Sequence, residues 1–129
     1  MTRRGVILLA EDHAQSVRAC VEALERLGWR VVVGDNLARL PEMILQERPS
    51  VLLLDAALPG GDVLELCRGL RRRAVPVILL VPPRFDGRQL DALRPLAEEC
   101  IAKPFDAEDV ARRVIRLADL LQDDAALAL

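Results

Sequence analysis

The sequence predicts an α/β protein built on a doubly wound, five-stranded parallel sheet with five helices, in the flavodoxin-like strand order 2-1-3-4-5. Five short apolar runs alternate along the chain with segments of helical periodicity, which is typical of parallel strands joined by crossover helices. The strongest runs are continuously apolar, as in strands that are buried on both faces. With 129 residues, the chain has the size of one domain, and right-handed crossovers leave few other topologies.

The first strand is predicted at residues 6–10, where the apolar run VILLA ends at the acidic pair Glu11 and Asp12. In residues 14–27 apolar side chains recur every three or four positions, which predicts a helix with one buried face, and Gly28 ends it. The first strand therefore carries two carboxylates at its carboxyl end.

A second strand is predicted at residues 29–33, near the edge of the sheet. The turn residues 34–36 follow it and lead into a helix at residues 37–47. Pro49 ends that helix because proline cannot continue the helical hydrogen bonds.

The stretch VLLLDAALPGGD, residues 51–62, organises the rest of the chain. Its four leading apolar residues predict a strand buried on both faces, and this strand ends at Asp55. The turn residues 59–61 leave Asp55 at the carboxyl end of the strand, where open parallel sheets place their sites. Asp is also common in turns, so a simple capping role for Asp55 is an alternative at this point.

A third helix is predicted at residues 63–70, closed by the arginine run 71–73, whose charge suits a helix C-terminus. Residues 76–81, PVILLV, form the fourth predicted strand, which two further prolines break. A short helix is predicted at residues 87–93.

The fifth strand is predicted at residues 100–102 and ends at Lys103. Asp106 caps the last helix, whose apolar residues recur at helical spacing as far as residue 121. We therefore expect a domain at residues 1–121 and a tail without a regular element at residues 122–129.

The composition is that of an ordinary globular protein. Hydrophobic residues make up 52% and charged residues 29%, with a net charge of -2, so we expect neither disorder nor direct binding of nucleic acid. The apolar runs are too short for a membrane span or a signal peptide, so we expect a cytoplasmic protein without membrane contact. Three scattered cysteines without a CxxC pair predict buried free thiols.

Lysine usage singles out one residue. The chain has 18 lysines and arginines together, and Lys103 is the only lysine. Arginine normally serves solvation and ion pairing as well as lysine does. We therefore expect Lys103 to have a role that requires lysine.

In the predicted strand order, the carboxyl ends of the first, third and fifth strands meet in one crevice, which would hold Glu11, Asp12, Asp55 and Lys103. Three crowded carboxylates repel one another, and a hard divalent cation relieves this repulsion, which predicts bound Mg²⁺. Asp55 would then be able to attack a phosphoryl group while the cation and the Lys103 ammonium neutralise its oxygens.

Several motifs resemble the CheY-like receiver domain of two-component response regulators. They are ILLAEDH at residues 7–13, DAALP at 55–59, PVILLV at 76–81 and KPF at 103–105. Their order and spacing are compatible with that family over nearly the whole chain. The resemblance implies the fold described above and a role in phosphorelay signalling.

Carried over by position, the resemblance implies a role for each site residue. Asp55 would be the phosphoacceptor and Lys103 the phosphate-binding base. Glu11 and Asp12 would bind the metal ion together with Asp55, and Ala57 would add its backbone carbonyl.

Two positions depart from the family pattern. Val81 stands where the family carries a Ser or Thr that binds the phosphoryl group, and Cys100 stands where it carries the Tyr or Phe of its conformational switch. The chain contains no tyrosine at all. We expect chemistry at Asp55 to persist, with weaker coupling to conformation because one hydrogen bond to a charged group is lost.

Three functions remain open on the sequence. The preferred one is a stand-alone receiver that accepts phosphate from a histidine kinase or phosphotransfer protein, is not otherwise an enzyme, and signals through protein contacts. The second is a pseudo-receiver that docks a partner on the face of the fourth strand, fifth strand and last helix without phosphorylation. The third is an unrelated flavodoxin-like enzyme or nucleotide binder, which is disfavoured because the loop EDHAQS lacks a glycine-rich phosphate cradle.

Overall fold

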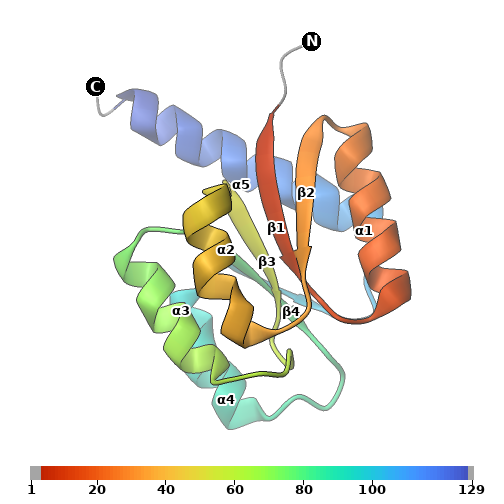
Figure 1. Cartoon of the computed structure of the whole chain (residues 1–129), viewed down its shortest axis with the longest axis vertical. Helices are drawn as coiled ribbons and strands as arrows, with labels where there is room; N and C mark the ends of the chain where they lie inside the picture. Colours follow the sequence, from red (N-terminus) through yellow and green to blue (C-terminus); the bar gives the residue numbers. More distant parts are fainter. Residues whose placement is uncertain (1–3, 128–129) are drawn as a thin grey trace.

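The computed structural model describes the backbone of residues 4–127 and the side chains of residues 4–121. Five parallel strands form one sheet in the order β2-β1-β3-β4-β5, which confirms the predicted fold class (Figure 1). The strands are β1 (Gly5–Ala10), β2 (Trp29–Gly34), β3 (Val51–Asp55), β4 (Val77–Val81) and β5 (Glu99–Ala102).

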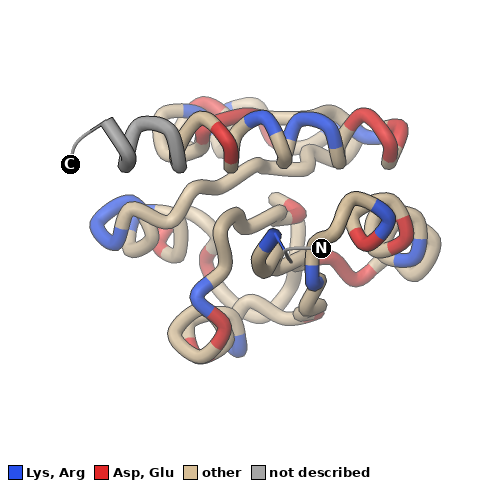
Figure 2. The backbone as a smooth tube through the Cα atoms, turned by 90° about the horizontal axis from the view of Figure 1, so that it is seen from above, with Lys and Arg blue, Asp and Glu red and all other residues tan. Residues whose placement is uncertain are grey.

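Helices cover both faces of this sheet. They are α1 (Ala14–Arg26), α2 (Leu40–Glu47), α3 (Val63–Arg72), α4 (Gly87–Leu93) and α5 (Ala107–Leu127). Apolar residues of α1 and α5 share one core cluster, and those of α2, α3 and α4 share a second one on the opposite face. Charged residues lie mostly on the helices and loops around the sheet (Figure 2).

The central strands are apolar along most of their length because both faces are buried. In β1, Ile7 and Leu9 enter the cluster with α1 and α5, whereas Leu8 between them enters the cluster with α2, α3 and α4. In β3, Leu53 and Leu52 divide between the two clusters in the same way, and these leucines and isoleucines of β1 and β3 are 0% exposed. The continuous apolar runs are thus explained by a two-sided core.

The turn after β3 contacts the segment that precedes α2. Gly60 has a φ angle of 104°, and a side chain there would collide with Asn36, so this position requires glycine. The Leu37 amide donates a hydrogen bond of 2.8 Å to the Pro59 carbonyl. The turn that ends β3 therefore also anchors the segment before α2.

The helix predicted at residues 37–47 begins differently from the expectation. It starts as a 3₁₀ turn, Leu37–Arg39, and becomes α-helical at Leu40. Pro41 lies in the first turn of α2, where proline is favoured because that position needs no amide donor.

The last helix is longer than predicted. It was expected to end at residue 121 before an irregular tail, but α5 continues to Leu127. Alanine and leucine, which are frequent at the end of this segment, have the highest helix propensities, and this explains why the helix continues beyond residue 121. The expected domain limit thus falls within a continuous helix. No helix among the described residues is both long enough and apolar enough to cross a bilayer.

The three cysteines are free thiols, and two of them are fully buried as expected. Burial raises the pKa of Cys20 and of Cys67 to about 11, so that both stay protonated and unreactive near neutral pH. Cys100 on β5 is only half-buried.

Candidate functional site

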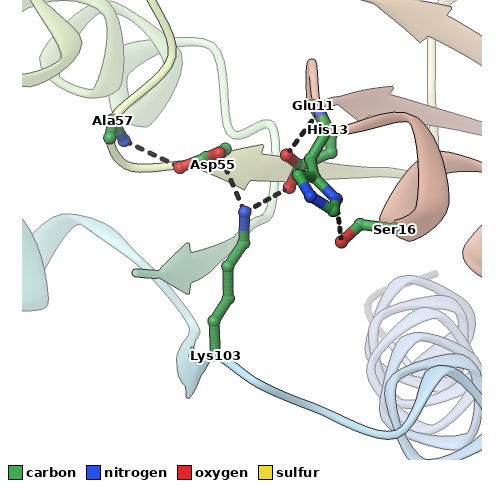
Figure 3. A network of polar contacts seen from close by, with 6 residues as sticks. All are labelled: Glu11, His13, Ser16, Asp55, Ala57 and Lys103. Carbon is green, nitrogen blue, oxygen red and sulfur yellow. Dashed lines mark hydrogen bonds and ion pairs between the residues drawn. The ribbon is translucent and has the colours of Figure 1, made fainter. Parts of the chain in front are cut away.

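The predicted site residues meet at the carboxyl edge of the sheet. Glu11 follows β1, Asp55 ends β3 and Lys103 follows β5, and their side chains point toward one another (Figure 3). Together with Asp12 they line a pocket of about 430 Å³. Because parallel strands end at the same edge, residues far apart in sequence share one pocket.

Lys103 connects the two buried carboxylates of the pocket. Its Nζ lies 2.9 Å from Asp55 Oδ2 and 2.7 Å from Glu11 Oε2. Burial by itself lowers the pKa of Lys103, but the hydrogen bonds and charges of Glu11 and Asp55 outweigh burial and raise it. The ammonium is thus fully charged at neutral pH, beside the carboxylate that is the candidate nucleophile.

Asp55 is oriented by a contact on each carboxylate oxygen. The Ala57 amide donates a hydrogen bond of 2.8 Å to Oδ1, and Lys103 donates one to Oδ2. The residue is 5% exposed, and its side chain is among those that line the pocket. This carboxylate is therefore held in one orientation and is still accessible from the pocket. The predicted role of the Ala57 carbonyl as a metal ligand stays a prediction.

Glu11 lies deeper than the other acids and is 1% exposed. Burial raises its pKa, and the charge of Asp55 adds to this, although contacts with Lys103 and the His13 amide oppose it. Among the described residues, the Lys103 ammonium is the one partner of Glu11 Oε2, at 2.7 Å. A buried carboxylate oxygen in this state is a ready ligand for a cation.

The exposed Asp12 completes an acidic cluster. Carboxylate oxygens of Glu11, Asp12 and Asp55 all lie within 4.8 Å of one another. Three carboxylates against one ammonium leave an excess of negative charge, and oxygen ligands suit a hard divalent cation. The three carboxylates, including the buried Glu11 oxygen whose contact is Lys103, therefore fit a cation of the Mg²⁺ type.

The two atypical positions lie on β4 and β5, and neither is among the residues that line the pocket. Val81 ends β4, and its carbonyl accepts a hydrogen bond of 2.8 Å from the Lys103 amide. The side chains of Val81 and Cys100 both pack against the apolar cluster that contains α3 and α4. These two positions thus offer no hydroxyl to the site.

Further residues also line the pocket. His13 and Ser16 line the pocket from the start of α1, and Pro83 and Phe105 line it from the loops after β4 and β5. From the sequence, a role of His13 in the loop or helix start is favoured over an approach to the metal ion, because hard cations prefer oxygen ligands. Its position directly after two candidate metal ligands was the one available signal.

The comparison with known families agrees with this geometry. The family model of the response regulator receiver domain matches residues 7–115, from β1 into α5. This chain belongs to the response regulator receiver domain family. The resemblance inferred from the sequence motifs is thereby confirmed, and the acidic cluster with Lys103 lies in the pocket of a receiver domain.

Two transcriptional regulatory proteins are similar to this chain in sequence. It is 29% identical over 112 residues to the phosphate regulon transcriptional regulatory protein PhoB of Pseudomonas aeruginosa, covering 84% of this chain and 49% of PhoB. It is 33% identical over 109 residues to the KDP operon transcriptional regulatory protein KdpE of Escherichia coli, covering 84% and 48%. The chain therefore spans about half the length of these curated relatives.

A solved structure shows the shared fold. The CheY-like response regulator receiver domain protein from Methanospirillum hungatei JF-1 superposes with a TM-score of 0.83 at 19% sequence identity. The match covers 93% of this chain and 98% of that one. At this identity the likeness concerns the fold, which is the five-stranded arrangement of Figure 1.

Proposed function

We propose that this receiver domain accepts a phosphoryl group on Asp55 from a histidine kinase or a phosphotransfer protein, and that it signals through protein contacts. The observation that supports this most is the accessible Asp55 carboxylate, with the Lys103 ammonium 2.9 Å away and an acidic cluster around it. Membership of the receiver family supports the same class of donor.

Each residue of the pocket would have a separate role in phosphoryl transfer. A lone pair of an Asp55 oxygen forms the new O–P bond while the P–N bond of a phosphohistidine breaks, and the imidazole nitrogen keeps that electron pair and takes up a proton. Lys103 then places its charge beside the phosphoryl oxygens. Glu11, Asp12, Asp55 and the Ala57 carbonyl would hold Mg²⁺, which supplies further positive charge when bound.

This function makes the chain a phosphoacceptor and not an enzyme with a separate substrate. Its own turnover is limited to phosphoryl transfer onto Asp55 and hydrolysis of the resulting aspartyl phosphate. We propose the face of β4, β5 and α5 for the downstream contact, where Arg113 of α5 pairs with Glu99 of β5 at 2.6 Å.

Intact-protein mass spectrometry after incubation with acetyl phosphate and Mg²⁺ tests the proposal. We expect a phosphate-sized gain in mass for the parent chain, and no gain after Asp55→Asn or when the metal is removed by a chelator. The Asp62→Asn variant is the matched control because Asp62 only caps α3, with bonds to the amides of Leu64 and Glu65. A folded parent chain that gains no mass contradicts the proposal.

A specific observation favours a second candidate, the pseudo-receiver. Val81 and Cys100 carry neither the hydroxyl nor the aromatic group of a switch. Both side chains pack against an apolar cluster. Such a domain would dock its partner on the same face whether or not Asp55 is phosphorylated. Equal partner affinity of the parent and of Asp55→Asn would support this candidate.

Restoring a hydroxyl at the end of β4 is expected to strengthen the phosphorylated state. In Val81→Thr the new hydroxyl would donate to a phosphoryl oxygen, and a hydrogen bond to a charged group contributes about 1.5–3 kcal/mol. We expect the lifetime of the phosphorylated form to increase about tenfold, measured by the decay of its mass signal. Val81→Ala, which adds no hydroxyl, is the control. An unchanged lifetime in Val81→Thr would show that the hydroxyl is not limiting.

A further inference from the structure

The pocket around Asp55 has few side chains that donate hydrogen bonds. Among the residues that line it, only Lys103, His13 and Ser16 carry an N–H or O–H donor on the side chain. The β4 side contributes Pro83, which has no donor at all. The start of α1 therefore provides every neutral side-chain donor of this pocket.

Lys103 has limited capacity for further contacts because it already serves two carboxylates, Glu11 and Asp55. A phosphoryl group on Asp55 brings three more negatively charged oxygens into a pocket that also contains Asp12. A side-chain donor besides Lys103 and the metal ion would stabilise one of these oxygens. Val81 offers none, since its side chain is apolar and packs against the core.

His13 and Ser16 form a pair at the first turn of α1. His13 is the N-cap residue of this helix, with φ −83° and ψ 113°, and Ser16 follows three positions later. Their side chains lie next to each other, with Ser16 Oγ 3.4 Å from His13 Nδ1 (Figure 3). When the hydroxyl donates to Nδ1, the imidazole proton lies on Nε2. The ring then presents an N–H donor on its other side.

We propose that His13 is a phosphoryl-binding residue of this receiver domain, which donates a hydrogen bond from Nε2 to a phosphoryl oxygen on Asp55, and that Ser16 is its positioning residue. The inference rests on the proposed function and deepens it, because it names what replaces the hydroxyl absent at Val81. The α1 side of the pocket thus takes over a contact that the β4 side cannot make.

Beryllofluoride, a stable mimic of a phosphoryl group, allows a test that does not depend on phosphoryl transfer. The full chain would be titrated with beryllofluoride and Mg²⁺, and bound fluorine would be followed by ¹⁹F NMR, in which each of the three fluorines reports its own hydrogen bonds. In His13→Ala we expect about tenfold weaker binding and a shift of one fluorine resonance, as for the loss of one hydrogen bond to a charged group.

Matched variants separate the hydrogen bond from a structural effect. His13→Gln retains an N–H donor and should recover most of the affinity and the resonance, whereas Ser16→Ala should weaken binding about two- to threefold. Gln15→Ala, an exposed neighbour on α1 that does not line the pocket, should change nothing. His13 is itself exposed, so its variants should unfold at the temperature of the parent, which circular dichroism checks.

The possible outcomes test the role of His13 separately from the proposed phosphorylation of Asp55. If the parent binds beryllofluoride and His13→Ala binds it with the same affinity and the same three resonances, the role of His13 is overturned while the proposed function stands. If the parent binds no beryllofluoride in the presence of Mg²⁺, the proposed function fails and the role of His13 fails with it.

Discussion

Replacing Lys103 with methionine is expected to destabilise the fold and to abolish rapid phosphorylation together. The variant keeps a side chain of similar length but leaves Glu11 and Asp55 without their shared ammonium, 2.7 and 2.9 Å away in the parent. Removing one partner of a buried ion pair costs about 3–5 kcal/mol, and the lower end applies because this pocket is open to water. We therefore expect the free energy of unfolding to fall by about 3 kcal/mol at neutral pH.

Lys103 and Glu11 make the stability of the fold depend on pH in opposite directions. The raised pKa of Lys103 means that its stabilisation is complete below its ordinary value of 10.5 and is lost as the pH rises through the raised pKa. The raised pKa of Glu11 acts in the opposite sense, because the folded state binds that proton more tightly and loses stability as the pH rises from the ordinary value of 4.5. Without Lys103, the pKa of Glu11 should rise further.

Urea unfolding at several pH values measures these effects. The difference in unfolding free energy between Lys103→Met and the parent should narrow as the pH falls from neutral toward 4.5, the ordinary pKa of Glu11, because Glu11 takes up its proton. The difference should also narrow when Mg²⁺ is added. The double variant Glu11→Gln with Lys103→Met is the control, since it removes both charges and should recover part of the loss. Equal urea midpoints for the parent and Lys103→Met would show that the pair does not stabilise the fold.

Truncating Leu53 to alanine is expected to have the largest effect on stability alone. Leu53 is 0% exposed in the central strand β3 and lies in register with Leu9 on one side and Ile78 on the other. A tightly paired strand cannot collapse into the cavity that the substitution leaves. We expect a loss of about 3–5 kcal/mol, a large part of the stability of a domain of this size.

Thermal or urea unfolding checks the prediction for Leu53, with a control of the same chemistry. Leu45→Ala removes the same atoms from a side chain that is 61% exposed on α2, so we expect a change within about 0.5 kcal/mol. Similar losses in both variants would contradict the two-sided core of the central strands.

The fold was largely predictable because its signals are local. Continuous apolar runs mark strands buried on both faces, and Leu8 beside Leu9 illustrates this, since the two side chains enter opposite clusters. The end of the last helix was not predictable in the same way, because Leu121 carries no breaker and alanine and leucine continue the helix to Leu127. Boundaries without a proline or glycine depend on propensities too weak to locate them.

The site was predictable in its residues but not in its contacts. Asp55 and Lys103 stood out by their positions at strand ends and by lysine usage, and the structure brings them within 2.9 Å. The pocket positions of His13 and Ser16 were not predicted, since a histidine at a helix start and a serine in its first turn have many ordinary roles. Their presence at the pocket follows from the direction in which α1 leaves β1.

The sequence by itself determined the strand order, the family and the identity of the acidic residues and the lysine. These features depend on apolar periodicity and on the residues at strand ends, which are local properties of the sequence. The tertiary structure alone decided which oxygens Lys103 contacts, how deeply Glu11 is buried and that α1 lines the pocket with His13 and Ser16. These properties depend on residues that are distant in sequence and become neighbours only when parallel strands end at one edge of the sheet.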